Sequence, residues 1–264
     1  MNNIHMLCGL PRSGSTLLGN VLEQHPDIWV SGTSSLSACV QDVSRVISNS
    51  EEVKSELASD PANLERYRNS LLGLIRGRYS DIDKVVIDKG RLWTAMRPLV
   101  DEILPESKFI VCVRDPRDVI ASVELQHRDT AIFMQEGDQT LIQYAESLML
   151  KDSMVGGPIW HIEDLLRRQL TDNVIFVRYE TFTLDPQTTM QRISDELKLN
   201  EFKWDFKNVT NRERDEDAIW RNKFPHKGEG EIKPSIGSWK DVMDEELASQ
   251  ILNVYPLYKA TFGY

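Results

Sequence analysis

The stretch "GLPRSGSTLL", Gly9–Leu18, decides the fold class of this 264-residue chain. It is close to the nucleotide-triphosphatase loop G-x-x-x-x-G-K-[ST], because the glycines Gly9 and Gly14 are correctly spaced and Thr16 is in place. Ser15, however, stands where that loop has its lysine. The apolar run "NIHMLC" precedes the loop, and leucines at helical spacing follow it. This order of strand, loop and helix is the context in which such a loop binds phosphate.

The loop carries its positive charge in an unusual place. Arg12 is its fixed cation, three positions before the missing lysine. The backbone N–H groups of residues 13–16 lie at a predicted helix start, which favours anion binding. Without the lysine, the loop is poorly suited to a β/γ-phosphate pair with magnesium. Glycine-rich turns also occur for tight packing alone, but this spacing, followed by two hydroxyl residues, favours phosphate binding.

Strand and helix patterns alternate along the rest of the chain. Apolar runs predict strands at residues 84–90, 108–113 and 173–179, in addition to the first. Helical patterns cover residues 62–78, 141–149, 190–197 and about 244–255, with another helix starting near Pro116. This alternation predicts an α/β fold, a P-loop-type three-layer sandwich with a central parallel sheet flanked by helices. We expect residues 1–264 to form a single domain, with a long, functional or disordered segment at 200–242.

Composition and charge narrow the class of partner. The hydrophobic content of 41% and charged content of 27% are ordinary for a soluble globular protein. The net charge of −10 argues against a general nucleic-acid binder, although a pocket can be locally positive. Three sparse cysteines suit a reducing compartment, and no segment has the pattern of a signal peptide or membrane span. We therefore expect a cytoplasmic protein without a membrane anchor.

A second motif, "VCVRDPRDVIAS", adds another candidate anion site. Arg114 ends a predicted strand, and Ser122 lies two turns into the helix that follows. Both can face a phosphate at the carboxyl end of the sheet, where open parallel sheets bind ligands. The alternative is that Arg114 pairs with a nearby carboxylate such as Asp118.

Taken together, the two motifs resemble the sulfotransferase family, which uses 3′-phosphoadenosine 5′-phosphosulfate (PAPS). The similarity is greatest to tyrosylprotein sulfotransferases and related bacterial-type enzymes. Their pattern recurs in order as "HPD" at 25–27, "DKG" at 88–90 and "VRYE" at 177–180. Near the end of the chain, "IKPSIGSWK" at 232–240 resembles the lysine-rich loop that closes over the nucleotide. The resemblance spans about residues 5–240.

The resemblance implies a role for each matching residue. Arg12 and Lys89 would neutralise charge on the transferring sulfuryl group and on the leaving phosphate oxygen. The other implied contacts are to the donor. The 5′-phosphate would be held by Ser13, Gly14, Ser15 and Thr16, and the 3′-phosphate by Arg114 and Ser122. Tyr179 would lie against the adenine, and Lys227 and Gly228 would clamp the 3′-phosphate, with Lys233 as a second candidate. Alternatives remain open at two positions, since Lys89 can be a solvated strand-end lysine and Tyr179 a core aromatic. No metal is implied.

A general base is missing where the family places it. Tyrosylprotein sulfotransferases have a glutamate just after the "HPD" region, and no carboxylate occurs here from residue 31 to 40. Cytosolic sulfotransferases have a histidine two places after the strand-end lysine, and here that position is Arg91. Asp88, His127 and His226 are the remaining candidates, none of them favoured.

The sequence therefore predicts a PAPS-dependent sulfotransferase that moves a sulfuryl group to a hydroxyl or amine acceptor and releases adenosine 3′,5′-bisphosphate. The acceptor class stays open among small molecules, saccharides and peptides. Two alternatives remain: a P-loop kinase or NTPase that lacks the loop lysine, and a non-catalytic nucleotide-binding module.

Overall fold

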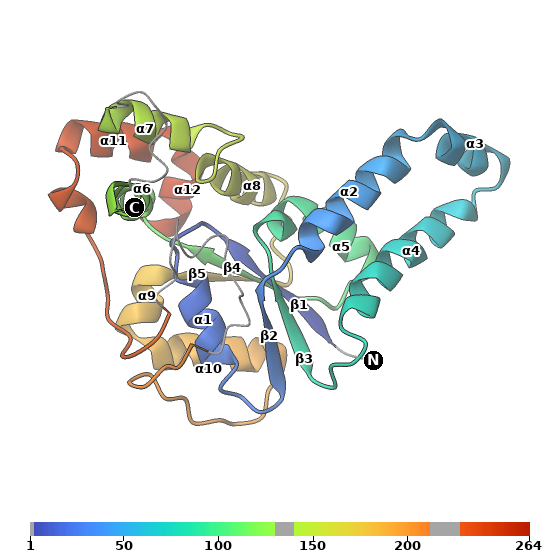
Figure 1. Cartoon of the computed structure of the whole chain (residues 1–264), viewed down its shortest axis with the longest axis horizontal. Helices are drawn as coiled ribbons and strands as arrows, with labels where there is room; N and C mark the ends of the chain where they lie inside the picture. Colours follow the sequence, from blue (N-terminus) through green and yellow to red (C-terminus); the bar gives the residue numbers. More distant parts are fainter. Residues whose placement is uncertain (1–2, 130–139, 212–227) are drawn as a thin grey trace.

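The computed structural model describes residues 3–129, 140–211 and 228–264. A five-stranded, all-parallel sheet lies at its centre, in the order β2-β3-β1-β4-β5 (Figure 1). The strands are β1 (Ile4–Gly9), β2 (Ile28–Thr33), β3 (Val85–Lys89), β4 (Phe109–Val113) and β5 (Val174–Arg178). The first strand of the chain is thus the central one, and the glycine loop leaves the sheet at its middle.

The register of the strands brings distant parts of the chain to one edge of the sheet. Leu7 of β1 pairs with Lys89 of β3, and Gly9 pairs with Cys112 of β4. Because all the strands are parallel, their carboxyl ends lie together, and ligands of open α/β sheets bind there. The loop after β1, the lysine that ends β3 and Arg114 after β4 consequently converge.

Alternation along the strands creates two apolar layers. Met6 and Val111 point to one face, whereas Leu7, Ile110 and Cys112 point to the other. The face of Leu7 is covered by α1 (Ser15–Leu22), α9 (Tyr179–Leu184) and α10 (Pro186–Leu197). The three layers, helices on both faces of a parallel sheet, confirm the predicted fold class.

The face of Met6 carries more helices. They are α2 (Leu36–Asn49), α4 (Asn63–Arg78), η1 (Arg91–Met96), α5 (Arg97–Ile103), α6 (Pro116–Asp129), α7 (Leu141–Met149), α8 (Gly156–Arg167), η3 (Ser238–Asp241), α11 (Glu245–Val254) and α12 (Pro256–Phe262). Helices α2 and α4 extend beyond the sheet as an arm, with α3 (Glu51–Ser59) at its tip (Figure 1). No helix in the described part of the chain is both long and apolar enough to cross a membrane.

Several elements were not predicted from the sequence, among them β2 and α12. The edge strand β2 follows the "HPD" turn, and it was missed because its second half, "SGT", is polar and small. Helix α12 follows α11 after a break at Tyr255 and Pro256, since a proline cannot donate a hydrogen bond to the preceding turn. Within residues 200–242, the described parts include a bridge between Val209 and Gly230 and the η3 turn.

Candidate active site

The glycine loop is held in shape by its backbone. Gly9 has φ +119°, and a Cβ there would lie 2.0 Å from the carbonyl oxygen of Cys112, so only glycine fits. Gly14 is also left-handed, with φ +82°. The Ser13 hydroxyl donates to the Leu10 carbonyl at 2.6 Å, which closes the turn from within. The backbone N–H groups at the start of α1 are therefore presented to the space above the loop.

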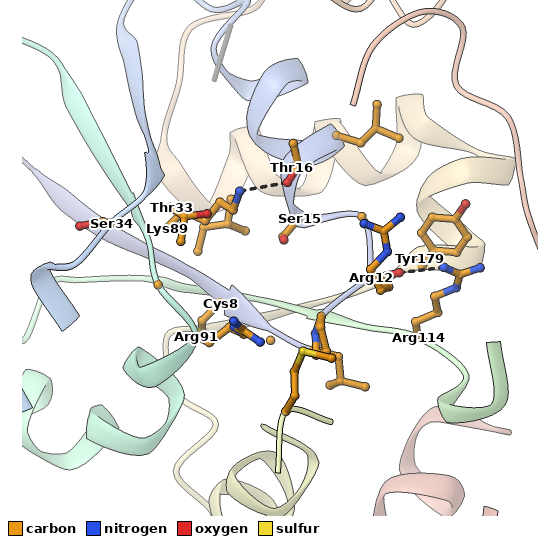
Figure 2. Close-up of a pocket in the computed structure, with 18 of the residues that line it drawn as sticks. Cys8, Arg12, Ser15, Thr16, Thr33, Ser34, Lys89, Arg91, Arg114 and Tyr179 are labelled. Atoms are coloured by element: carbon orange, nitrogen blue, oxygen red, sulfur yellow. Dashed lines mark hydrogen bonds between the residues drawn. The ribbon is translucent and has the colours of Figure 1, made fainter. Parts of the chain in front are cut away.

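A cavity of about 450 Å³ opens at this edge of the sheet, above the loop (Figure 2). Its charged lining residues, among those described, are the cations Arg12, Lys89, Arg91, Arg114 and Lys233 and the carboxylates Glu229 and Glu231. A locally cationic cavity on a chain of net charge −10 indicates a ligand that is itself anionic.

Lys89 supplies a cation beside the loop. Its Nζ donates to the Thr16 Oγ1 at 2.9 Å, and its backbone N–H donates to the Ser31 hydroxyl at 2.8 Å. Only 8% of the residue is exposed, so it is not a solvated strand-end lysine. The hydrogen bond to Thr16 directs the ammonium toward the first turn of α1, as Figure 2 shows.

Arg12 is positioned by the second motif. Its Nε donates to the Ser122 hydroxyl at 3.1 Å, which joins the loop to α6. Burial, and then repulsion from Arg114, lowers the pKa of the Arg12 guanidinium below its ordinary value. The guanidinium groups of Arg12 and Arg114 repel each other in a recess, so the site favours a bound anion that would offset this repulsion.

Arg114 has an incomplete set of partners. Its two terminal nitrogens donate to the carbonyl oxygens of Arg12 at 2.8 Å and Ser235 at 2.6 Å. Its Nε is buried and has no hydrogen-bond partner. The guanidinium stacks on Tyr179, with its central carbon 4.1 Å from the ring centre. A buried, unpaired N–H on a fixed cation is a feature that an anionic ligand would satisfy.

Asp118 has a different role from the one considered in the sequence. Its carboxylate does not pair with Arg114. It accepts hydrogen bonds from the Gly237 N–H at 2.8 Å, the Ser238 hydroxyl at 3.2 Å and the Trp239 N–H at 3.0 Å. This contact ties the "GSWK" segment to α6, and therefore sets the position of the residues just before it, among them Ser235.

Comparison with known proteins assigns the chain to a family. The family model described as "Sulfotransferase family" matches residues 6–204. The chain belongs to the sulfotransferase family. The cytosolic sulfotransferase 12 of Arabidopsis thaliana is 27% identical over 172 residues, which cover 56% of this chain and 50% of the plant protein. The chain thus spans about half the length of this curated relative.

Solved sulfotransferases share the fold. The mouse sulfotransferase SULT7A1, complexed with PAP, has a TM-score of 0.59 at 16% identity, over 98% of this chain and 84% of the mouse chain. The sulfotransferase domain of the Synechococcus PCC 7002 olefin synthase has a TM-score of 0.55 at 22% identity, over 100% of this chain and 96% of that domain.

The structure brings most of the residues expected for a sulfotransferase to one place. Arg12, Gly14, Ser15, Thr16, Lys89, Arg114, Tyr179 and Lys233 line the cavity. Ser122 contacts the cavity through Arg12, and the Ser13 hydroxyl is turned into the loop. Gly228 lies against α1, and its carbonyl accepts from the Asn20 side-chain amide at 2.8 Å. Lys227 lies outside the described residues.

Two of the candidate bases, Asp88 and His127, are not among the residues that line this cavity. Asp88 is fully buried, and its carboxylate accepts from the Tyr79 hydroxyl and from the Trp93 Nε1 at 2.6 Å. Burial raises the pKa of Asp88 above its ordinary value. His127 stacks on Tyr144, with ring centres 4.8 Å apart. His226 lies outside the described residues.

Other cavity residues were missed by sequence reasoning. The end of β2 and the start of α2 contribute Thr33, Ser34 and Ser37. The segment that begins at residue 228 contributes Glu229 and Glu231. No motif points to the three residues of the first group, because β2 itself was not predicted. Within the described residues, no cluster of three or more His, Cys, Asp or Glu side chains could hold a metal ion.

Proposed function

We propose that this chain transfers a sulfuryl group from PAPS to a hydroxyl or amine acceptor and releases adenosine 3′,5′-bisphosphate. The observation that carries the proposal is a set of cations around one cavity. Lys89 donates a hydrogen bond to Thr16, Arg12 donates one to Ser122, and Arg114 keeps a buried Nε without a hydrogen-bond partner. A mouse relative of the same fold is complexed with PAP, which supports PAPS as the donor.

The residues present suit the two ends of such a donor. The loop amides, Ser15 and Thr16 would hold the 5′-phosphate, and Arg114 with Ser122 would hold the 3′-phosphate. Tyr179 would support the adenine. Lys233 and the segment from Gly228 would cover the nucleotide, with Lys227 as a further contact. These roles rest on the family resemblance and on the contacts described above.

Electrostatic stabilisation is the chemical contribution of this site. Sulfuryl transfer moves negative charge onto the leaving phosphate oxygen, and fixed cations lower the barrier most where charge develops. Lys89 and Arg12 are held by hydrogen bonds to Thr16 and Ser122, so they need little reorganisation as that charge appears. We propose that these two residues stabilise the transition state.

Activity with labelled donor tests the function. Purified protein, PAPS with a labelled sulfuryl group and a broad acceptor panel should give labelled product. Lys89→Ala should lower kcat by about 10²–10³-fold, and Arg12→Ala should reduce kcat more than donor affinity. Lys84→Ala is the control, because Lys84 is an exposed lysine just before the other end of β3.

The alternatives make different predictions in the same assay. A kinase or NTPase would turn over ATP with magnesium, and would not consume PAPS. A non-catalytic module would bind adenosine 3′,5′-bisphosphate but give no product with any acceptor. Either result would overturn the proposal.

The acceptor, the location and the domain organisation belong to the same proposal. Small molecules, saccharides and peptides are the acceptor classes considered, and nucleic acid is not. A cytoplasmic location is supported by the cytosolic plant relative. A single sulfotransferase domain, residues 1–264, is supported by the two apolar clusters that pack on opposite faces of one sheet.

A further inference from the structure

Arg91 is a cation among the described residues that line the cavity, and the proposed donor gives it no role. It lies two residues after Lys89, across Gly90, whose backbone is extended with φ −156° and ψ 128°. In an extended chain, side chains two residues apart leave on the same side, and each residue advances the chain by about 3.3 Å. Lys89 and Arg91 therefore both line the cavity, separated by roughly 6–7 Å along the chain.

Close packing fixes this geometry. A Cβ at Gly90 would lie 2.7 Å from the Ser37 hydroxyl and 3.1 Å from the Trp93 Nε1, so the backbone here sits tightly between α2 and η1. Trp93 is fully buried and is held by Asp88. Arg91 consequently begins η1 from a rigid base.

The guanidinium of Arg91 has no counter-charge among the residues that the structure describes. Within the part of the chain that the structure describes, it forms no ion pair or hydrogen bond, and no carboxylate acts on its pKa. Its side chain is exposed to the cavity, yet the surrounding wall desolvates it enough to lower that pKa below the ordinary value. The two carboxylates among the described cavity residues, Glu229 and Glu231, are on another segment, and Glu231 pairs with Lys233 at 3.3 Å.

Arg91 also lies away from the groups proposed for the 3′-phosphate and the adenine. Figure 2 shows it beside Cys8, on the side of the cavity with Lys89, whereas Arg114 and Tyr179 lie at the opposite side. Ser34 and Ser37 line the cavity as well. This end is polar and cationic, and it adjoins the lysine proposed to contact the transferring group.

We propose that Arg91 selects an acceptor that carries an anionic group, a carboxylate or phosphate, a short distance from the hydroxyl that is sulfated. The proposal rests on the sulfotransferase function above and names the acceptor class for it. The reacting hydroxyl would face Lys89, and the anion would pair with Arg91, one extended dipeptide away. A charge-assisted pair in a partly desolvated recess favours the anionic acceptor over its neutral analogue by about 10-fold to 100-fold.

Matched acceptors test this selection. The probes are 4-hydroxyphenylacetate against 4-hydroxyphenylacetamide, and 3-hydroxybutyrate against 3-hydroxybutyramide. Binding is measured by calorimetry in protein saturated with adenosine 3′,5′-bisphosphate, and kcat/KM is measured with PAPS. In at least one pair, the acid should be preferred by about 10-fold or more, and Arg91→Ala or Arg91→Gln should remove the preference.

Charge reversal and a distant arginine provide the controls. Arg91→Glu should shift the preference toward tyramine, which has an ammonium in place of the carboxylate. Arg45→Ala should keep the wild-type preference, because Arg45 is exposed on α2, where it pairs with Asp42. All the Arg91 variants should bind adenosine 3′,5′-bisphosphate as the wild type does.

Three results would overturn the proposal, and each is distinct. No preference for either acid, with bisphosphate binding intact, means that Arg91 does not select an anionic acceptor. An equal loss of kcat/KM for acid and amide in Arg91→Ala means that Arg91 acts on the reacting hydroxyl instead. Absence of bisphosphate binding in the wild type overturns the sulfotransferase function itself, and the acceptor proposal with it.

Discussion

Replacing Arg114 with alanine tests whether this residue recognises the 3′-phosphate. Arg114 is 5% exposed, and its guanidinium donates to two backbone carbonyls and keeps a buried Nε without a hydrogen-bond partner. A charge-assisted hydrogen bond to a phosphate contributes about 1.5–3 kcal/mol. Arg114→Ala should therefore weaken adenosine 3′,5′-bisphosphate by about 10-fold to 150-fold.

The assay compares two nucleotides that differ at one position. Adenosine 3′,5′-bisphosphate and adenosine 5′-monophosphate are titrated calorimetrically into the wild type and Arg114→Ala. Loss of the carbonyl contacts to Arg12 and Ser235 loosens the site for both ligands. The difference between the two losses therefore isolates the 3′-phosphate, and the monophosphate should change by no more than about threefold.

Tyr258→Phe is the matched control for position. The Tyr258 hydroxyl exchanges hydrogen bonds with the backbone N–H and carbonyl of Arg114, at 3.1 and 2.9 Å. The variant removes this support but keeps the guanidinium, so both nucleotides should weaken slightly and equally. Equal losses of both nucleotides in Arg114→Ala would refute the assignment, since Arg114 would then support the site without binding the 3′-phosphate.

Three further predictions concern the scaffold. Gly9→Ala should lower the free energy of unfolding by about 2–4 kcal/mol, or prevent folding, because the added Cβ would meet the Cys112 carbonyl. Gly77→Ala should instead raise it by about 0.5–1 kcal/mol, because nothing lies within 4 Å of the added Cβ. Similar denaturation midpoints for the two variants would contradict this prediction. Burial lowers the pKa of His5 from 6.5 to about 4, so between these pH values the unfolded state binds a proton that the folded state does not. The free energy of unfolding of the wild type should therefore fall by up to about 3 kcal/mol as the pH falls through this window, and that of His5→Gln should fall by less. Asp118→Asn should lower stability by about 2 kcal/mol and weaken bisphosphate binding, and unchanged affinity would show that the Gly237–Trp239 turn does not support the nucleotide site.

The sequence was sufficient for the framework because that framework depends on local patterns. The loop spacing, the apolar runs and the position of Arg114 after a strand all lie within short stretches. Parallel strands bring their carboxyl ends together, so residues that follow different strands meet without further information. Lys89, which ends β3, and Arg12, in the loop after β1, line one cavity for this reason.

Long-range contacts could not be predicted in the same way. The partners of Asp118 lie about 120 residues further along the chain, in the Gly237–Trp239 turn. Ser13 was expected to hold the 5′-phosphate, and the structure adds a contact that spacing does not report: its hydroxyl donates to the Leu10 carbonyl and closes the loop from within. Both outcomes depend on which acceptor is nearest in three dimensions, and spacing does not report that.

The loop that lacks its lysine has a cation from elsewhere in the fold. Ser15 occupies the lysine position, yet Lys89 reaches the same helix start and donates to Thr16 at 2.9 Å. The register makes this possible, because Leu7, two residues before the loop, pairs with Lys89 on the neighbouring strand. A cation on β3 approaches the ligand from the sheet instead of from the loop, so it can contact a transferring group between donor and acceptor. The missing lysine and the strand-end lysine are therefore two parts of one arrangement. Arg91, two residues further on, adds a second cation on the Lys89 side of the cavity, where we propose that the acceptor binds.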